Sequence, residues 1–120
     1  MNGIVDEFGR AMVKIDLWSA TCGERIETTV WVDSAFNGEL VIPRALVSAA
    51  GFEQSAGIRA RLADGNEVTL EAYACELDWF GSRRAVEVIA NDGEFPLLGI
   101  GLLIGHRLTI DYTDLTVTIE

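Results

Sequence analysis

The sequence contains few of the residues that bind nucleic acids and metal ions. It has 9 lysines and arginines against 19 aspartates and glutamates, which gives a formal net charge of −10 at pH 7. Because such a surface repels phosphate groups, we expect neither nucleic acid nor an anionic membrane as a partner. The 1 histidine and 2 cysteines are fewer than the about four ligands of a closed zinc site. We therefore expect no metal and no cofactor.

Long apolar segments are also absent. The longest nearly unbroken apolar run, 95–105, is well short of the ~20 residues that cross a bilayer as a helix. The first part of the chain lacks the basic start and apolar core of a secretory signal. With 120 residues, of which 49% are hydrophobic and 23% charged, the composition is that of an ordinary globular chain. We expect one cytoplasmic domain, 1–120, whose Cys22 and Cys75 are reduced and packed as small apolar groups.

Apolar and polar residues alternate along most of the chain, which predicts an all-β fold with one or two short helices. Pro43 and Gly51 stand where a helix typically begins and ends. The run 100–104 fits a short helix or a buried strand, and its periodicity does not separate the two. We expect most of the larger aromatic residues in the core, namely Trp31, Phe36, Tyr73, Trp79 and Phe80. The expected strands are 13–17, 26–32, 40–42, 58–62, 68–73 with a continuation to 79, 84–90, 107–112 and 115–119.

A tight turn separates two of these strands. Asp64, Gly65 and Asn66 lie between the apolar segments 58–62 and 68–73. An Asp-Gly pair supplies the positive φ angles that a tight turn requires, so the two segments are predicted to form a hairpin. By itself this pattern fits an ordinary surface hairpin.

Asp33 is the candidate catalytic residue that the sequence singles out. It follows the apolar run Val30-Trp31-Val32 and precedes the small residues Ser34 and Ala35. A strand that is apolar to its end predicts a carboxylate in a dry, fixed place, where it costs several kcal/mol unless hydrogen bonds compensate. Small neighbours let backbone amides approach it closely. Asp-Ser-Ala alone is a weak signal, since Asp and Ser begin turns in many proteins.

The segment 30–43 resembles the active-site region of small retropepsin-like aspartic proteases. That family combines apolar residues, Asp, Thr or Ser, Gly and an apolar residue, followed by Gly, a short apolar strand and Pro. Two further motifs follow in the family's order: the glycine-tipped hairpin at 64–66 and the sequence Leu97-Leu98-Gly99 before a predicted helix. The resemblance covers about residues 10–119. It departs from the family at Ala35, where Gly is usual.

The resemblance implies a retropepsin-like acid-protease fold, which is a closed β-barrel-like domain, in a homodimer that cleaves a peptide or protein substrate. It implies that Asp33 is catalytic and that Ser34 holds the two active-site loops in register by a hydrogen bond to the partner. The hairpin would close over the substrate as a flap. The implied support of the active-site loop comprises Ser34, Ala35, Leu97, Leu98 and Gly99, and the implied flap residues are Ala63, Asp64, Gly65 and Asn66.

A second catalytic aspartate is missing from the chain, because the other aspartates stand in turns and other solvated contexts. Hydrolysis by this chemistry needs two carboxylates that share one proton. A two-fold symmetric dimer supplies the second carboxylate, since it places each residue opposite its own copy. The methyl group of Ala35 crowds the paired loops in such a dimer unless they shift. The alternatives are a non-catalytic homodimeric β module that binds peptide or protein, and a purely structural oligomer.

Overall fold

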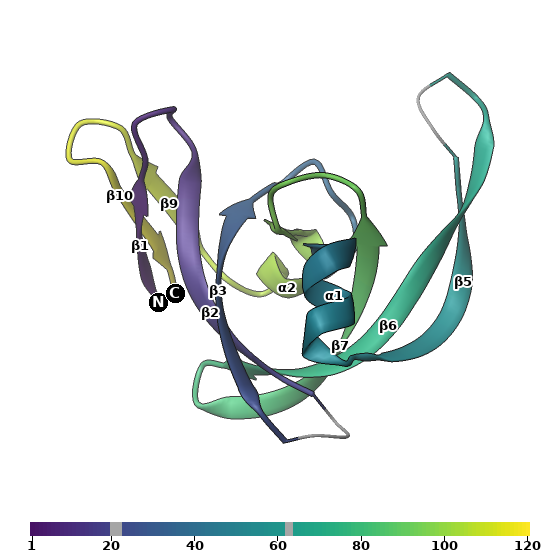
Figure 1. Cartoon of the computed structure of the whole chain (residues 1–120). Coiled ribbons are helices and arrows are strands. Elements are labelled where there is room, and N and C mark those ends of the chain that lie inside the picture. Colours follow the sequence, from purple (N-terminus) through teal and green to yellow (C-terminus); the bar gives the residue numbers. More distant parts are fainter. Residues whose placement is uncertain (20–22, 62–63) are drawn as a thin grey trace.

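The computed structural model describes residues 1–19, 23–61 and 64–120. This part of the chain forms ten strands and two short helices (Figure 1). The elements, in chain order, are β1 (Asn2–Val5), β2 (Ala11–Trp18), β3 (Arg25–Val32), β4 (Leu40–Pro43), α1 (Arg44–Ala50), β5 (Glu53–Arg61), β6 (Glu67–Trp79), β7 (Ser82–Asn91), β8 (Leu97–Leu98), α2 (Ile100–Leu103), β9 (Leu108–Asp111) and β10 (Thr116–Ile119).

All ten strands belong to one sheet that curls into a closed, barrel-like structure. Their order across the sheet is β5-β6-β7-β4-β8-β3-β2-β1-β10-β9. A further pairing of β2 with β6, at Leu17 opposite Leu77 and Trp18 opposite Glu76, closes the central strands into a ring. The all-β prediction is therefore confirmed.

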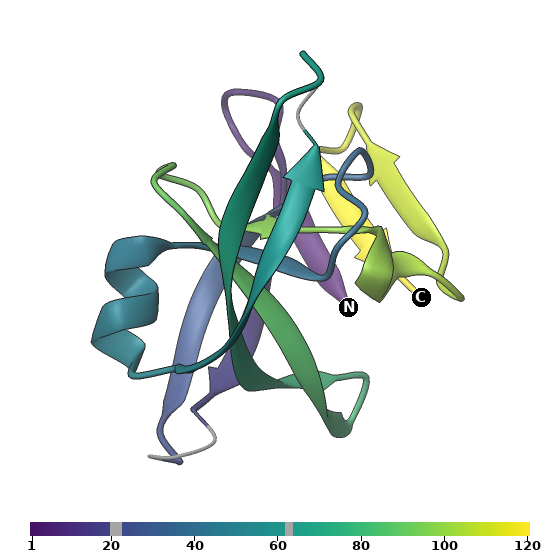
Figure 2. The same ribbon diagram turned by 90° about the vertical axis from the view of Figure 1, so that its right-hand side faces the viewer.

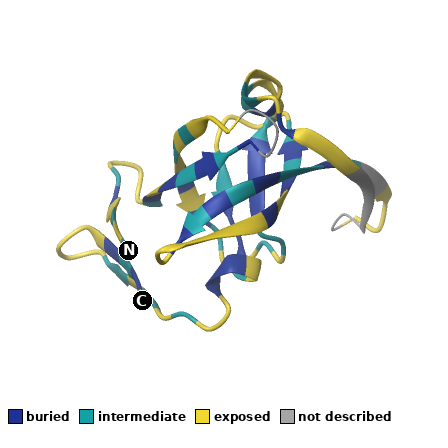
Figure 3. Ribbon diagram, turned by 90° about the horizontal axis from the view of Figure 1, so that it is seen from below, coloured by how far each residue is buried: buried dark blue, intermediate teal, exposed yellow. Residues whose placement is uncertain are grey.

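The core consists of every second residue of the long strands, as the alternating pattern predicts. On β2, Val13, Ile15 and Leu17 are each at most 3% exposed, whereas Lys14 between them is exposed. Figure 3 shows this alternation of buried and less buried positions along the strands. Cys75 lies in the core as expected, while Cys22 lies outside the described residues.

Both helices occupy the places that the sequence indicates. α1 begins directly after Pro43 and ends directly before Gly51, whose φ of 68° is the left-handed conformation that glycine adopts without strain. The run 100–104, for which a helix or a strand was open, forms α2 and buries Leu102 and Leu103.

Several expectations about the core and the strands were incomplete or wrong, and β8 at Leu97–Leu98 was not predicted as a strand. β1, which pairs with β2 and β10 in the sheet, was not predicted, because its four residues carry too little periodicity to be recognised. β5 begins at Glu53 rather than at 58, since it pairs with β6 along its full length through a bulge. The prediction that most large aromatics are buried was also wrong. Trp79 is 5% exposed, but Trp31 and Phe80 are 37% and 45% exposed.

Candidate active site

Asp33 lies at the end of β3, beside the segment that carries the Leu97-Leu98-Gly99 motif. β8 lies between β3 and β4, parallel to the first and antiparallel to the second. The backbone amide of Asp33 donates a hydrogen bond of 2.8 Å to the carbonyl oxygen of Leu98. Leu98 is fully buried. Asp33 follows β3, which is paired with β2 on one side and with β8 on the other.

Backbone amides at the start of α2 hold the loop that follows Asp33. The amides of Gly99, Ile100 and Gly101 donate to the carbonyl oxygens of Glu39, Phe36 and Gly38 at 2.9, 2.8 and 3.0 Å. The approach is so close that a Cβ atom on residue 99 would overlap the carbonyl of Gly38 and lie 2.7 Å from that of Phe36. Only glycine fits at this position.

Glu39 ties the same loop to β7, and the sequence analysis did not identify it. Its carboxylate accepts a hydrogen bond of 2.9 Å from the guanidinium of Arg84 and one of 3.0 Å from the amide of Glu87. The signal that could have identified Glu39 is an acidic residue directly before the apolar strand 40–42, but that pattern is common in turns.

The carboxylate of Asp33 is half-buried in the single chain rather than fully enclosed. Its Oδ1 accepts a hydrogen bond of 2.9 Å from the amide of Ala35, which closes a tight turn. Its Oδ2 accepts no hydrogen bond from the described residues. Ser34 and Ala35 are exposed, and the hydroxyl of Ser34 has no partner in the part of the chain that the structure describes. In the described part of the chain, Oδ2 of Asp33 and the hydroxyl of Ser34 thus remain available for an external partner.

The predicted hairpin is formed by β5 and β6 and projects beyond the barrel (Figure 1). Gly65 has a φ of 89°, and the carboxylate of Asp64 accepts hydrogen bonds from the amide and the side chain of Asn66 at 3.0 and 2.9 Å. These three residues form an exposed turn, as the sequence predicts. Ala63, the fourth predicted flap residue, lies outside the described residues.

Solved structures of aspartic proteases have a similar fold. The chain is similar to a retropepsin-like aspartic protease from Rickettsia conorii, with a TM-score of 0.70 and 15% identity over 99% of this chain and 89% of that one. The chain has a retropepsin-like fold. Two viral enzymes give lower scores. For the EIAV protease complexed with the inhibitor HBY-793, the TM-score is 0.57 and the identity 16%, over 83% of this chain and 92% of that one. For the simian foamy virus (mac) protease in solution, the TM-score is 0.50 and the identity 15%, over 77% and 92%.

The sequence itself matches no protein-family model and no curated protein. The retropepsin-like fold is therefore recognised from the course of the backbone, together with the short motifs that the sequence analysis identified.

An aromatic cluster surrounds Arg10, which directly precedes β2, and it includes Trp31 of β3, the strand that leads to Asp33. The guanidinium carbon lies 4.0 Å from the ring centre of Phe95, 5.0 Å from that of Phe8 and 5.7 Å from that of Trp31. Asp6 pairs with Arg10 at 2.7 Å. Trp31 is exposed because its ring packs against these surface residues rather than in the core.

His106 and Cys75 have surroundings that are typical of structural rather than catalytic residues. Trp79 Nε1 donates a hydrogen bond of 3.2 Å to His106 Nε2, and the imidazole stacks on the ring of Phe80. Burial raises the pKa of the Cys75 thiol to about 12, and the charges of Glu39 and Glu76 add to this effect. Such a thiol stays protonated at neutral pH and is a poor nucleophile.

Within 1–19, 23–61 and 64–120, no group of His, Cys, Asp and Glu is arranged to hold a metal ion.

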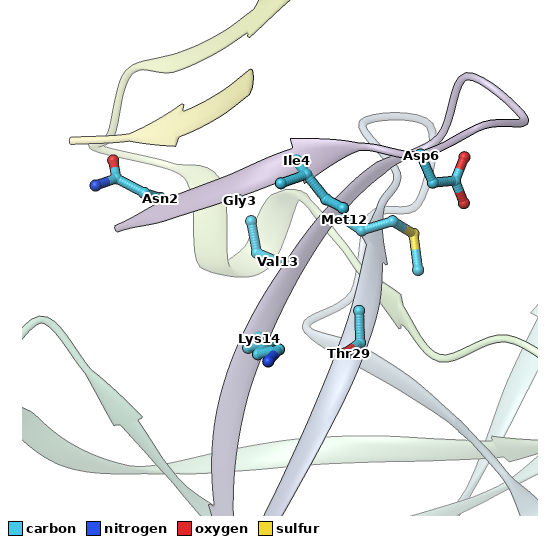
Figure 4. A pocket seen from close by; sticks show the side chains of 8 residues that line it. All are labelled: Asn2, Gly3, Ile4, Asp6, Met12, Val13, Lys14 and Thr29. Atoms are coloured by element: carbon cyan, nitrogen blue, oxygen red, sulfur yellow. The ribbon is translucent and has the colours of Figure 1, made fainter. Parts of the chain in front are cut away.

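A hollow of about 530 Å³ lies over β1, β2 and β3 (Figure 4). It contains none of the residues that the sequence analysis proposed for the active site. The residues that line the hollow are Asn2, Gly3, Ile4, Asp6, Met12, Val13, Lys14 and Thr29.

No helix in the described part of the chain has the length and apolar character needed to span a membrane.

Proposed function

We propose that this chain is an aspartic endopeptidase that acts as a symmetric homodimer, with Asp33 of each subunit at the two-fold axis. The observation that carries the proposal is the position of Asp33 in a retropepsin-like fold. It lies on a loop held by the amides of residues 99–101, and one of its carboxylate oxygens has no partner in the described chain. The turn closed by the hydrogen bond from the amide of Ala35 to Oδ1 of Asp33 orients the carboxylate.

The proposed reaction uses the two carboxylates in different protonation states. The ionised carboxylate removes a proton from a water molecule, whose oxygen attacks the scissile carbonyl carbon, while the neutral one donates its proton to the carbonyl oxygen. Because two like charges at close range do not both ionise, the pair retains one proton under acidic conditions. The reaction needs no covalent intermediate, metal or cofactor.

The other predicted residues support this chemistry by position. The exposed hydroxyl of Ser34 is proposed to donate a hydrogen bond to the partner's loop, which keeps the two carboxylates in register. Leu97, Leu98 and Gly99 support the loop from below. The turn at 64–66 is proposed to close over the substrate and exclude water, with Ala63 beside it in the sequence.

The proposed substrate is an extended peptide or protein segment lying between the hairpin and the Asp33 loop. Such a segment adds to an exposed strand through main-chain hydrogen bonds and places alternate side chains in pockets. The proposed setting is the cytoplasm, without nucleic acid or membrane as a partner.

The test is digestion of a peptide library at acidic pH. We expect cleavage by the wild-type chain, with a specific activity that rises with protein concentration as dimers form. Asp33→Asn is expected to fold and dimerise but to cleave nothing. An Asp92→Asn variant, which makes the same change in an exposed turn, is expected to retain activity. Full cleavage by the Asp33→Asn variant refutes the assignment.

A mixing experiment tests whether the site is shared between subunits. An excess of the Asp33→Asn chain should inhibit the wild-type chain, because mixed dimers contain one catalytic carboxylate. Activity that is indifferent to the added variant contradicts a shared site.

The alternative function is a non-catalytic homodimeric module that binds peptide or protein. Ala35, at the position where the family usually has glycine, favours it, because the added methyl group stands where the two loops meet. That alternative predicts that the wild-type chain binds the library peptides and leaves them intact, and that Ala35→Gly raises cleavage.

A further inference from the structure

The loop between β3 and β4 contains an asparagine that is followed directly by glycine, Asn37-Gly38. Asn37 is exposed, and Gly38 lies in a bend outside any strand or helix. The side-chain carbonyl of an asparagine can react with the backbone amide of the next residue. Glycine allows the closest approach to that amide, because it has no Cβ atom. The pair is therefore a candidate site of spontaneous covalent modification.

Both groups that would react are free of hydrogen bonds within the described residues. They are the carboxamide of Asn37 and the backbone amide of Gly38. The surrounding main chain is held, since the carbonyl oxygen of Phe36 accepts a hydrogen bond of 2.8 Å from the amide of Ile100. The carbonyl oxygen of Gly38 accepts one of 3.0 Å from the amide of Gly101. Figure 2 shows this loop beside α2. The reactive amide thus remains free in a loop that is fixed on both sides of it.

The packing of the loop requires the glycine of this pair. A Cβ atom on residue 38 would overlap the ring of Phe36. The carbonyl of Gly38 also lies so close to Gly99 that a Cβ atom there would overlap it. A larger residue at position 38, which would protect Asn37 from reaction, therefore does not fit into the loop.

Asn2-Gly3 has the same dipeptide sequence in a different structural setting. Asn2 is also exposed, but Gly3 lies in β1, which is paired with β2 on one side and with β10 on the other. The amino group of Met1 and the amide of Ile119 each donate to the carbonyl oxygen of the other at 2.9 Å. Bonded pairs alternate along the ladder, so the amide of Gly3 is bonded to Val117. A bonded amide in an extended strand is not available for the reaction.

The other two asparagines lie in turns and use their side chains there. Asn66 donates a hydrogen bond of 2.9 Å to the carboxylate of Asp64, and Asn91 Oδ1 accepts one of 3.3 Å from the amide of Gly93. Each is followed in the sequence by an acidic residue rather than by glycine. In the described part of the chain, Asn37 alone combines an unbonded side chain with a free glycine amide.

We propose that Asn37 is a site of spontaneous deamidation, with water as the co-reactant. The amide nitrogen of Gly38 loses its proton to solvent base and attacks Cγ of Asn37, so that a new C–N bond forms. The Cγ–Nδ2 bond breaks, and the nitrogen takes a proton from water and leaves as ammonia. Water then opens the resulting succinimide. Opening at Cγ gives aspartate, and opening at the main-chain carbonyl gives isoaspartate.

The isoaspartate product changes the loop more than the aspartate product does. It places the former side-chain Cβ atom in the main chain, between the carbonyls of Phe36 and Gly38 that bond to the amides at the start of α2. A longer chain between two fixed points cannot keep both bonds in place. Both products also add a negative charge to a chain whose formal net charge is already −10.

The loop that would move is the one that continues from Asp33. We therefore expect the peptidase activity to decline with the age of the protein, as isoaspartate accumulates at residue 37. This expected effect rests on the proposed function. The modification itself does not, because it depends on the asparagine, the glycine and water alone.

Incubation of the folded chain at mildly alkaline pH, followed by peptide mapping with mass spectrometry, tests the modification. We expect Asn37 to deamidate at least about tenfold faster than Asn2, because the amide of Gly3 is protected in the sheet. Isoaspartate and aspartate should both appear at residue 37. A folded chain in which Asn37 stays intact, or reacts no faster than Asn2, overturns the proposal.

The same incubation in concentrated urea shows whether the fold sets the difference. Unfolding releases the amide of Gly3, so the rates at Asn2 and Asn37 should converge. Rates that differ in urea as much as they do in the folded chain would assign the difference to the neighbouring sequence, and would overturn the structural argument.

Two substitutions of Asn37 test the effect on activity. Asn37→Gln is the matched control, because glutamine keeps the carboxamide but its longer side chain closes a ring far more slowly. It should keep the activity that it has before incubation, whereas the wild-type chain loses activity as isoaspartate appears. Asn37→Asp adds the charge without lengthening the main chain, so it should cleave faster than a fully deamidated wild-type sample. Equal activities of these two samples overturn the lengthened main chain as the cause.

The outcomes separate this site from the catalytic proposal. Deamidation at Asn37 in a chain that cleaves no peptide at any age supports the modification site and refutes the endopeptidase. A chain that cleaves peptides while its Asn37 stays intact refutes the modification site and leaves the endopeptidase unaffected. Undiminished cleavage by a deamidated chain refutes the effect on the Asp33 loop.

Discussion

The amide of Asp33 and the carbonyl oxygen of Leu98 are joined by a hydrogen bond of 2.8 Å. This bond links the candidate catalytic residue to a strand that lies far along the chain and is inserted between β3 and β4. The position of the Asp33 carboxylate therefore depends on the packing of β8. Substitutions in β8 should change that position without altering the carboxylate itself.

Leu98→Ala is expected to destabilise the protein by about 2–5 kcal/mol, because it leaves a cavity at a fully buried site. Urea unfolding measures this loss. Peptidase activity should fall more than the folded fraction does, since the support of Asp33 relaxes. Leu115→Ala, at a position that is 50% exposed, is the control and should change stability by less than about 1 kcal/mol.

Gly99→Ala is expected to destabilise the chain by at least about 1–3 kcal/mol, because the new methyl group overlaps the carbonyl of Gly38. Gly93→Ala is the matched control, since its nearest neighbour is a side-chain atom of Asn91 at 3.3 Å that can move. The midpoints of thermal unfolding distinguish the two variants. Equal midpoints would mean that the contact between the Asp33 loop and α2 is looser than the structure shows.

The pair of Asp6 and Arg10 should make stability depend on pH at the acid end. Desolvation raises the pKa of Asp6, but hydrogen bonds from the amide and guanidinium of Arg10 and from the amide of Phe8 outweigh it and lower the pKa below 3.8. The folded pKa is below the unfolded one, so the stabilisation is present above pH ~4 and is lost as the pH falls through the folded pKa.

The measurement is the thermal midpoint of the wild-type chain and of Asp6→Asn between neutral pH and pH 2. The wild-type chain should be the more stable at neutral pH, and the difference should disappear at the acid end. Glu7→Gln, at an exposed neighbouring position, serves as the control. A difference between wild type and Asp6→Asn that stays constant to the lowest pH contradicts the pairing.

The thiol of Cys75 should be unreactive in the folded protein. Its pKa of about 12 and its burial at 2% exposure keep it protonated and inaccessible to a thiol reagent at pH 8. In a Cys22→Ser variant, where Cys75 is the remaining thiol, labelling should be slow without urea and fast in urea. Rapid stoichiometric labelling of the folded variant would show that this part of the core opens readily.

The local elements of this fold could be predicted from the sequence because their signals are local. Alternating apolar residues mark the long strands, Pro43 and Gly51 bound α1, and Asp64-Gly65 marks the tip of the long hairpin. Each signal rests on the conformational preference of a few neighbouring residues. The boundaries were less secure, since β5 extends to Glu53 through a bulge that only its pairing with β6 explains.

The surroundings of Asp33 were predicted in part. The sequence placed Leu97, Leu98 and Gly99 near the loop that follows Asp33 through a resemblance, and the structure brings these segments together. It also suggested an enclosed carboxylate, whereas the single chain leaves Asp33 half-buried. The single chain does not test that expectation, because the apolar residues before Asp33 describe only its own strand. The enclosure of a side chain depends on what other segments, or another subunit, place over it.

By itself, the sequence determined the alternation of the strands, the turns between neighbouring strands and the choice of Asp33 as the candidate acid. Only the tertiary structure decided that β8 inserts between β3 and β4, that β2 meets β6 to close the barrel, that β1 lies between β2 and β10, and that β9 remains an open edge. These arrangements join segments distant in the chain. Backbone hydrogen bonds hold them together, and because every residue type except proline offers the same donor and acceptor, the sequence does not record which strands will meet.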